Sequence, residues 1–484
     1  MDILHWITSH PYQTAGLILP IAIPLILFQV LPLLVLLERR GAAFIQDRVG
    51  PSRAYIPLPG LRIRAFGMLY NATDLIKLLF KENFVPPFAY KSFYWLAPAI
   101  PVATGLLTPA LLPWFSPILY QDGAGVSSLT GTLITTSSGL LLLFALGSLS
   151  VYGVVLGSWS SNSKFSLLGG MRASAMMISY EVSMGLSVLG LLLIVGSFNL
   201  TDIVEWQGHH TWGMFVQPIG FLLFLVSMFA ECNRNPFDVA EGESEIVGGF
   251  HTEYAGVKFM MFMTGEYLHV LVASALLATL YAGGYELLPF PVPMLADTSG
   301  FVPFLTTVFR PESYLSLDTL WVKAHLGGVV AIMLGITAVL VFVFATLIAG
   351  RRRNYAQQDA QDRDMRLREY GIYCSAFTGL GVMLLLGAIA CGLFMTTQPL
   401  VAAGTLSPQP IYPGWVNAVT AVLQFHIVIG KTLAFAWLFI WVRWTLPRFR
   451  YDQIMGLGWK VMLNIALVNL LITAIVAKAI GGGR

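Results

Sequence analysis

One short acidic stretch holds many of the residues in this chain that could do chemistry. Residues 230–254 read AECNRNPFDVAEGESEIVGGFHTEY, with six carboxylates and one arginine between two apolar segments. Asp238, Glu241 and Glu245 have the spacing i, i+3 and i+7, which places them on one face if the stretch is helical. Carboxylates that lose water beside one another have raised pKa values and can exchange protons near neutral pH. The stretch therefore predicts a proton relay, and a solvated acidic face is the simpler alternative.

Two further glutamates lie inside apolar segments, and the first glutamate of the acidic stretch lies at the edge of one. Glu181 and Glu266 each lie well within an apolar run, and Glu231 ends another. A carboxylate in hydrocarbon is costly unless it finds a partner or binds a proton, so such groups commonly mark function. We expect them to extend the relay; the alternative for Glu181 is a protonated side chain with a single interhelical hydrogen bond. Lys431, in the middle of another apolar run, predicts a carboxylate or a water-filled cavity beside it.

A polar segment farther toward the N-terminus has the pattern of an amphipathic helix. In YNATDLIKLLFKEN, residues 70–83, apolar residues alternate with Asp74, Lys77 and Lys81 at helical spacing. A helix with this pattern lies in the membrane interface. Its charged face is either part of a site or a solvated stripe with a local ion pair.

Several kinds of site have no support in the sequence. The three cysteines, Cys232, Cys374 and Cys391, cannot supply the four thiolates of an iron–sulfur cluster. The histidines show no metal-ligand spacing, and the acidic stretch lacks the ligand order of an EF-hand. The chain has no Gly-rich nucleotide loop and no basic patch interleaved with aromatic residues. We therefore expect no metal site, no flavin and no nucleic-acid partner.

The composition is that of an integral membrane protein. Hydrophobic residues make up 56% of the chain and charged residues 11%, against roughly 25% charged in soluble domains. Apolar windows of about 20 residues cross a bilayer as helices, which satisfy their own backbone groups in lipid. The sequence therefore predicts an all-α polytopic membrane protein of about ten transmembrane helices. The windows lie near 15–37, 93–115, 132–157, 173–196, 213–231, 255–282, 325–349, 371–395, 416–442 and 459–480.

The basic residues set the expected orientation of these spans. The connectors on one side of the membrane carry 23 of the 28 Lys and Arg residues. The positive-inside rule places this side, with the acidic stretch and the amphipathic helix, in the cytoplasm. Both chain ends are then expected on the periplasmic side.

Four blocks of the sequence resemble one known family. They are ERRGAAFIQDRVGPSR, WSSNSKFSLLGGMRASAMMISYE, ECNRNPFDVAEGESEIVGGFHTEYAGVKF and RWTLPRFRYDQIMGLGWKVMLN. These long, ordered blocks are similar to those of the H subunit of bacterial NADH:quinone oxidoreductase, the counterpart of mitochondrial subunit 1 of respiratory complex I. The resemblance covers most of residues 15–283 and 416–480.

The resemblance implies a membrane subunit that forms most of a quinone chamber and couples quinone reduction to proton translocation. The substrate would be ubiquinone or menaquinone, with no iron–sulfur or flavin group on this chain. The implied quinone-binding residues are Glu38, Arg39, Asp74, Lys77, Arg234 and Asp238. The implied proton path consists of Glu181, Glu231, Glu241, Glu243, Glu245 and Glu266.

The same resemblance implies where the chain works and with what. We expect a multi-pass subunit of the bacterial inner membrane and its respiratory chain. The implied partners are the iron–sulfur and quinone-site subunits of the peripheral arm, small membrane subunits, antiporter-like subunits and membrane lipid.

The chain departs from the family pattern in three places. Tyr70 and Asn71 stand where the family has a Gln-Pro pair, and AYIPLPGLRIRAFG, residues 54–67, is longer than usual. Residues 284–415 have no counterpart in the common eight-span pattern and contain two extra spans. We expect this insertion to pack outside the core as a helical hairpin that contacts lipid or a lineage-specific subunit. The chain then divides into a core part, the insertion and a second core part: 1–283, 284–415 and 416–484.

Two other functions stay open on the sequence alone. The membrane subunit of an energy-converting hydrogenase is homologous but has no quinone chamber, and the complete ERR to DRVGPSR block and the AEGESE connector argue against it. A stand-alone ion transporter predicts an internal repeat with broken helices, and we find no such symmetry.

Overall fold

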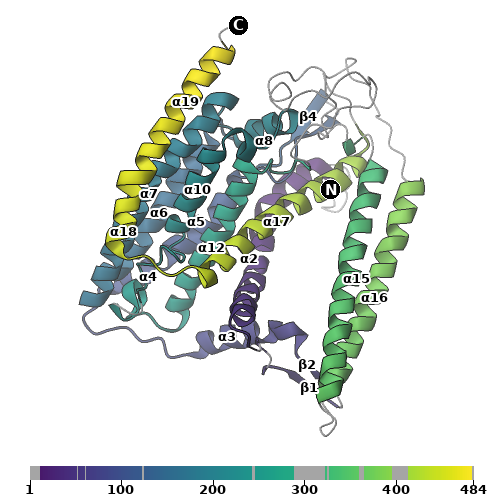
Figure 1. The fold of residues 1–484 in the computed structure, drawn as a ribbon, viewed down its shortest axis with the longest axis horizontal. Coiled ribbons are helices and arrows are strands. Elements are labelled where there is room, and N and C mark those ends of the chain that lie inside the picture. The colour runs from purple at the N-terminus through teal and green to yellow at the C-terminus, as the bar shows by residue number, and fades with distance from the viewer. Residues whose placement is uncertain are drawn as a thin grey trace, which may run out of the picture.

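The computed structural model consists mainly of long helices (Figure 1). The residues it describes are 11–48, 50–51, 53–59, 61–122, 125–242, 246–287, 322–323, 326–358, 365–394 and 412–481. The helices before the insertion are α2 (Pro11–Ile45), α3 (Met68–Phe80), α4 (Lys91–Leu96), α5 (Ala99–Leu107), α6 (Gly139–Ser160), α7 (Lys164–Val195), α8 (Leu200–His209), α9 (Gly213–Val216), α10 (Pro218–Glu231) and α12 (Gly256–Tyr281). Those within and after it are α15 (Leu326–Gln358), α16 (Met365–Phe394), α17 (Gly414–Thr445), α18 (Tyr451–Gly456) and α19 (Leu463–Gly481).

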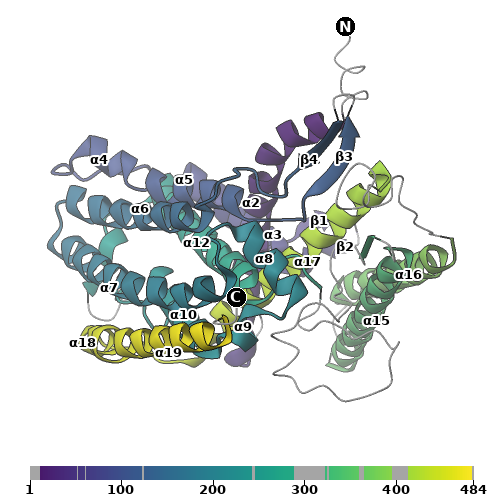
Figure 2. The ribbon, with the colours of Figure 1, turned by 90° about the horizontal axis from the view of Figure 1, so that it is seen from above.

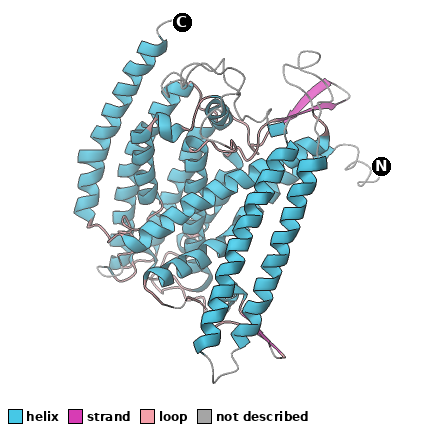
Figure 3. Cartoon of the chain, turned by 45° about the vertical axis from the view of Figure 1, so that its right-hand side comes forward, coloured by secondary structure: helices cyan, strands magenta, loops and turns pink. Residues whose placement is uncertain are grey.

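Shorter elements complete the chain. Three 3₁₀ segments are η1 (Ala65–Gly67), η2 (Thr108–Leu111) and η3 (Gly249–His251), and the π-helical segment η5 (Leu457–Met462) joins α18 to α19. The strands form two small antiparallel hairpins, β1 (Ile56–Leu58) with β2 (Leu61–Ile63) and β3 (Ile118–Asp122) with β4 (Gly125–Leu129). Both lie outside the helical bundle (Figure 3). The first is the tip of the long stretch 54–67, and neither was predicted.

The predicted spans match the helices closely. Among the described residues, nine helical stretches are long and apolar enough to cross a membrane, and each overlaps one predicted window. The remaining window, 213–231, is divided at Gln217 into the one-turn helix α9 and the 14-residue helix α10. A 14-residue helix is about 21 Å long, which is less than the hydrocarbon thickness. The all-α polytopic prediction is confirmed, with one span shorter than expected.

The core helices form a bundle centred on α7 and α12. Helix α7 packs against α6, α10 and α19, α12 packs against α5 and α17, and α17 runs obliquely across the bundle (Figures 1 and 2). Glycines permit the closest contacts: a Cβ on Gly265 of α12 would lie 2.7 Å from Pro101 of α5. A Cβ on Gly105 of α5 would lie 2.8 Å from Leu268 of α12. These backbone approaches fix the position of α12, which carries Glu266.

Helices α15 and α16, which belong to the segment predicted to be an insertion, lie side by side next to the main bundle (Figures 1 and 3). Gly381 faces Phe342 and Gly392 faces Ala331, which is the register of an antiparallel pair. Large apolar side chains on their outer surface are exposed, including Ile332 and Met383. This surface is suited to lipid.

Candidate functional site

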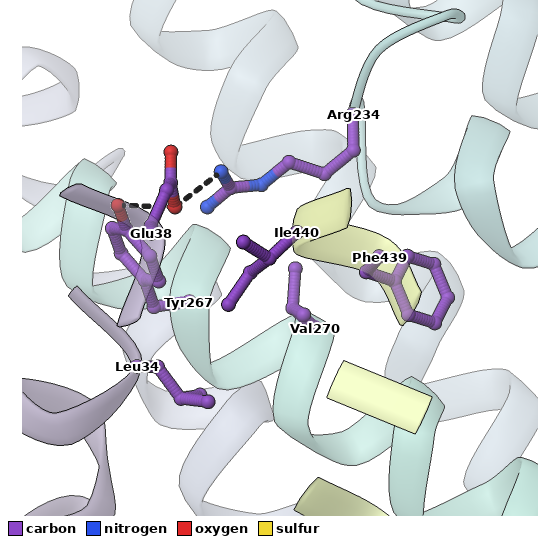
Figure 4. A pocket seen from close by; sticks show the side chains of 7 residues that line it. All are labelled: Leu34, Glu38, Arg234, Tyr267, Val270, Phe439 and Ile440. Carbon is purple, nitrogen blue, oxygen red and sulfur yellow. Dashed lines mark hydrogen bonds and ion pairs between the residues drawn. The ribbon is translucent and has the colours of Figure 1, made fainter. Parts of the chain in front are cut away.

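Glu38, near the end of α2, is the centre of a buried cluster of charged side chains. It is 5% exposed. Arg234 Nη1 donates to Glu38 Oε2 at 3.1 Å, and the Tyr267 hydroxyl donates to the same oxygen at 2.7 Å (Figure 4). Arg443 Nη1 donates to Oε1 at 2.5 Å. Side chains from α12, α17 and the connector after α10 therefore converge on one carboxylate of α2.

Arg234 links Glu38 to a second carboxylate. Its Nε lies 2.8 Å from Oε1 of Glu266, and its guanidinium lies over the Tyr267 ring, 4.5 Å from the centroid. Burial lowers the pKa of Arg234, but Glu266 and Glu38 together raise it by more, so the guanidinium stays charged. With Arg443, the cluster contains two acidic and two basic side chains.

Asp238 follows on the same connector but has a different ion-pair partner. Its Oδ2 lies 2.6 Å from Nη2 of Arg448, and the backbone N–H of Phe449 donates to the Pro236 carbonyl at 3.0 Å. Burial raises the pKa of Asp238, and the charge and hydrogen bond of Arg448 oppose that rise. These contacts tie the acidic connector to the segment between α17 and α18.

The acidic connector is not helical between residues 232 and 242, where the structure has turns. The backbone takes positive φ angles at Asn233 (49°) and Gly242 (41°), which a right-handed helix does not allow. Asp238 and Glu241 therefore do not share a helical face, and the prediction that they do is wrong.

Glu241 instead lines a cavity, and its Oε1 lies 4.0 Å from Nδ1 of His251. Glu243 and Glu245 lie outside the described residues, so their predicted roles stay predictions.

The two residues after Glu38 hold the segments that follow α2. Arg39 Nη2 pairs with Asp74 Oδ2 of α3 at 2.5 Å and lies over the ring of Tyr70. Arg40 donates to the Phe66 carbonyl, just before α3 begins. The structure thus brings Arg39 and Asp74 together, whereas Lys77 is exposed on α3.

Helix α3 has the properties of the predicted amphipathic helix. It has 13 residues and none of them is buried. Asp74 pairs with Arg39 of α2. The alternative of a local ion pair within α3 therefore does not hold for Asp74.

Two cavities, in which acidic side chains lie among mainly apolar ones, continue from the charged cluster into the bundle. The first has a volume of about 40 Å³ and includes Glu241, Glu266, Glu231 and His269 in its lining. The second, also about 40 Å³, is lined by Glu231, His269, Glu181 and other residues of α6, α7, α10 and α12. Each has room for a few water molecules. Because Glu231 and His269 border both cavities, the two cavities lie one after the other between Glu241 and Glu181.

Glu181 lines the second cavity, on the side away from Glu241. Ser148 of α6 donates a hydrogen bond to Glu181 Oε1. A single interhelical hydrogen bond was the alternative to a relay role, and it is present here. The cavity beside Glu181 means that the hydrogen bond does not exclude that role.

The cavity at Glu38 is much smaller. It is lined by Leu34, Glu38, Arg234, Tyr267, Val270, Phe439 and Ile440 (Figure 4). Its volume of about 10 Å³ holds roughly one water molecule. A molecule the size of a quinone headgroup does not fit within it.

Several residues of the site were missed by sequence reasoning. His269 lies three positions after Glu266 on α12, a spacing that places both on one helical face and could have revealed it. Its Nε2 lies 3.4 Å from Oγ1 of Thr104 on α5. Arg443 and Arg448 were counted only as cytoplasmic charges, although each lies opposite a buried carboxylate.

Lys431 has backbone partners in addition to the expected carboxylate. Its Nζ donates to the carbonyl oxygens of Ala282 at 2.6 Å, Gly284 at 3.0 Å and Glu286 at 2.5 Å. These carbonyls follow the C-terminus of α12, where the helix dipole favours a cation. The expected carboxylate is present as well, because the side chain of Glu286 lies close enough to act on the charge of Lys431. Lys431 thus fixes the end of α12 to α17.

Metal ligation has no candidate in the part of the chain that the structure describes. No three His, Cys, Asp or Glu side chains of those residues come together in a way that could hold an ion.

Comparison with known proteins gives a consistent match. The family model described as NADH dehydrogenase matches residues 17–357 and 369–474. The H subunit of NADH-quinone oxidoreductase from Bdellovibrio bacteriovorus is 33% identical over 478 residues, covering 94% of each chain. NADH-quinone oxidoreductase subunit 8 of Rhodothermus marinus is 35% identical over 446 residues, covering 91% of each chain. An H subunit of the same kind of enzyme from Geobacter sulfurreducens is 34% identical over 454 residues, covering 93% of this chain and 94% of the relative. The resemblance first drawn from four sequence blocks is confirmed, and the chain belongs to the NADH dehydrogenase family of NADH-quinone oxidoreductase membrane subunits.

Proposed function

We propose that this chain forms part of the quinone chamber of an NADH-quinone oxidoreductase and couples quinone reduction to a proton path. The observation that carries the proposal is the unbroken contact from Glu38 through Arg234 to Glu266, which borders the first of the two cavities. The chain is a subunit of the oxidoreductase and not an enzyme by itself. Quinone is its substrate.

The quinone would lie on the outer side of the Glu38 cluster. Arg39, Asp74 and Lys77 would border its path along α3, and Arg234 and Asp238 would face it from the acidic connector. Since the cavity at Glu38 holds roughly one water molecule, we infer that an adjoining subunit supplies the remaining walls of the chamber.

The coupling is electrostatic. Two-electron reduction of a quinone changes the local charge by up to two units before protons arrive. At roughly 10 Å and an effective dielectric constant of about 20, each unit charge changes the energy of a carboxylate by about 1.7 kcal/mol. A change of this size alters a proton-binding constant by more than tenfold. The charge-balanced cluster of Glu38, Arg234, Arg443 and Glu266 would pass this change inward, because its side chains share partners.

Protons would then move along the two cavities. Glu266 and Glu241 border the first, Glu231 and His269 border both, and Glu181 ends the second. Water molecules in these cavities would carry protons between side chains that are not in direct contact. Glu243 and Glu245 would extend the path toward the cytoplasmic connector.

The proposed setting follows from the family. We infer a place in the bacterial inner membrane with both termini periplasmic. The partners would be the iron–sulfur and quinone-site subunits of the peripheral arm, small membrane subunits and antiporter-like subunits. The exposed surface of α15 and α16 would contact lipid or a lineage-specific subunit.

Purification of the native complex tests this proposal. Co-isolation with iron–sulfur subunits and inhibitor-sensitive quinone reduction would support it. Hydrogen evolution would favour the hydrogenase-type alternative, and ion uptake by the isolated chain would favour the transporter alternative; either result with no quinone reduction would overturn the proposal.

A further inference from the structure

We propose that the hairpin of α15 and α16 is a brace that holds the stretch 54–67 and, through it, sets the position of α3. The effect of the brace on quinone rests on the proposed function. The existence of the brace does not rest on the proposed function, because its contacts lie outside the charged cluster.

A buried ion pair joins α16 to the stretch before α3. Arg64 Nη1 lies 2.9 Å from Glu369 Oε2, with side chains only 13% and 3% exposed. The backbone N–H of Arg64 donates to Glu369 Oε1 at 2.6 Å. The Tyr373 hydroxyl accepts the N–H of Ala65 at 3.1 Å and donates to Glu369 at 2.6 Å. One glutamate and one tyrosine of the insertion therefore bind two successive backbone N–H groups of the core.

An aromatic cluster reinforces this contact. The ring of Phe66 stacks on Tyr373 with 4.3 Å between centroids. Phe344 of α15 lies 5.9 Å away and Phe377 of α16 6.1 Å away. Aromatic residues of α15 and α16 therefore pack around the ring of Phe66 in the stretch 54–67.

The backbone at this point needs such support. Ala65, Phe66 and Gly67 have φ angles of 45°, 55° and 95°, three positive values in succession. Residues with a Cβ seldom adopt this region and keep it only where surrounding contacts determine it. For Ala65 and Phe66, many of those contacts come from the inserted hairpin.

The braced residues lead directly into the site. Gly67 is the N-cap of α3, and Arg40 donates to the carbonyl of Phe66. Its neighbour Arg39 pairs with Asp74 in the middle of α3. Because α3 has no buried residue of its own, its position depends on contacts at its surface. These are the contacts at its start, the Asp74 pair, the hydrogen bond from Asn71 to the Pro32 carbonyl, and packing against α2 and α12. Glu369 and Tyr373 are thus positioning residues for α3, although neither contacts the Glu38 cluster.

The sequence separates the partners of this contact widely. Arg64 and Glu369 lie 305 positions apart. The long stretch 54–67 and the segment 284–415 are both predicted departures from the common family pattern. The structure brings residues of the two segments into contact.

The test uses the intact complex in membranes with Glu369→Ala, Glu369→Gln and Tyr373→Phe. Ser375→Ala is the control, because Ser375 is exposed on the same helix and bonds only to carbonyls of its own helix. The first readout is tryptic cleavage after Arg62, an exposed residue of β2. We expect cleavage to be at least about fivefold faster in Glu369→Ala, with smaller increases in Glu369→Gln and Tyr373→Phe, since local opening exposes the stretch to protease.

The second readout is quinone reduction, normalised to the assembled complex. We expect KM for quinone to rise about threefold to tenfold in Glu369→Ala with kcat within twofold, because α3 binds substrate less well but the charged cluster is intact. Unchanged cleavage in the assembled variants overturns the brace. Faster cleavage with an unchanged KM would show that the brace does not affect α3. Loss of assembly in all three variants would show that the contact serves folding alone, and this result would also overturn the proposal. If Glu38→Gln leaves quinone kinetics unchanged, the proposed function fails, and the cleavage result still decides the brace.

Discussion

Glu38 and Arg234 form a buried ion pair with 3.1 Å between Oε2 and Nη1, although 196 positions separate them in the chain. The pair does not stand alone, because Arg443 binds the other oxygen of Glu38 and Glu266 binds Nε of Arg234. In a medium of low dielectric, such a cluster is stable only while its charges balance. A charge that arrives beside Glu38 therefore changes the energy of Glu266 and of the protons beyond it.

Arg234→Ala should impair both assembly and activity. It leaves two buried carboxylates without their shared partner, which generally costs about 3–5 kcal/mol. Arg234→Lys keeps the charge but cannot hold both carboxylates in the same fork, so we expect assembly with quinone reduction lowered at least about tenfold. Thermal stability of the complex and its quinone reductase rate check both.

The matched control for these variants is Arg450→Ala. Arg450 pairs with Asp452 at 3.2 Å, but the two side chains are 76% and 67% exposed. It should leave stability and rate unchanged. Equal losses in Arg450→Ala and Arg234→Lys would show that the buried cluster has no special role.

Glu231→Gln should uncouple or slow the complex without preventing its assembly. Glu231 borders both cavities, and an amide fills the same space but has no acid proton to donate. We expect proton pumping to fall at least about tenfold, with quinone reduction falling as well if the two are strictly coupled. Acidification assays on membrane vesicles measure the first and quinone reduction the second. Glu205→Gln on α8, outside both cavities, is the control, and equal behaviour of the two variants would contradict the path.

His269→Asn should lower proton pumping more than membrane insertion. His269 borders the same two cavities and lies one helical turn from Glu266. An asparagine keeps a polar side chain of smaller size but cannot bind and release a proton as an imidazole can. Full pumping in His269→Asn, with loss of assembly in His269→Ala, would assign this residue to packing instead.

Arg39 and Asp74 should show measurable coupling in a double-mutant cycle on quinone kinetics. Their side chains are 38% and 29% exposed, so the pair itself contributes only about 0.2–1 kcal/mol to stability. We expect each single alanine variant to raise KM for quinone and the double variant to raise it by less than the product of the two effects. Lys81→Ala, at the C-cap of α3, serves as control. Independent effects of Arg39 and Asp74 would mean that the pair does not position α3 for substrate.

Hydrophobicity alone located the spans because the constraint it reflects is simple. A helix that crosses lipid needs a long apolar run whatever its neighbours are, so nine of the ten windows matched helices of the described residues that are long enough to span. The division at Gln217 was not foreseen, because that side chain is satisfied by Thr473 and Asn469 of α19, more than 250 positions away. Contacts of this kind leave no local mark in the sequence.

The site was predictable where charge alone identified it. Glu181, Glu231 and Glu266 stood out because acids are rare in apolar runs, and the structure places all three beside the two cavities. The spacing of Asp238 and Glu241 wrongly predicted a shared helical face, because the backbone of the connector turns at Asn233 and Gly242. Arg443 and Arg448 were hidden among other basic residues, since only the fold shows which arginine meets a buried acid.

The most direct test of the central claim is the infrared difference spectrum of the purified complex on quinone reduction. We predict a change in the carbonyl band of a protonated carboxyl group that is lost in Glu231→Gln and Glu266→Gln and shifted in Arg234→Lys, because quinone charge alters proton binding through Arg234. A spectrum with no carboxyl change on quinone reduction, or one identical in wild type and all three variants, would contradict the account.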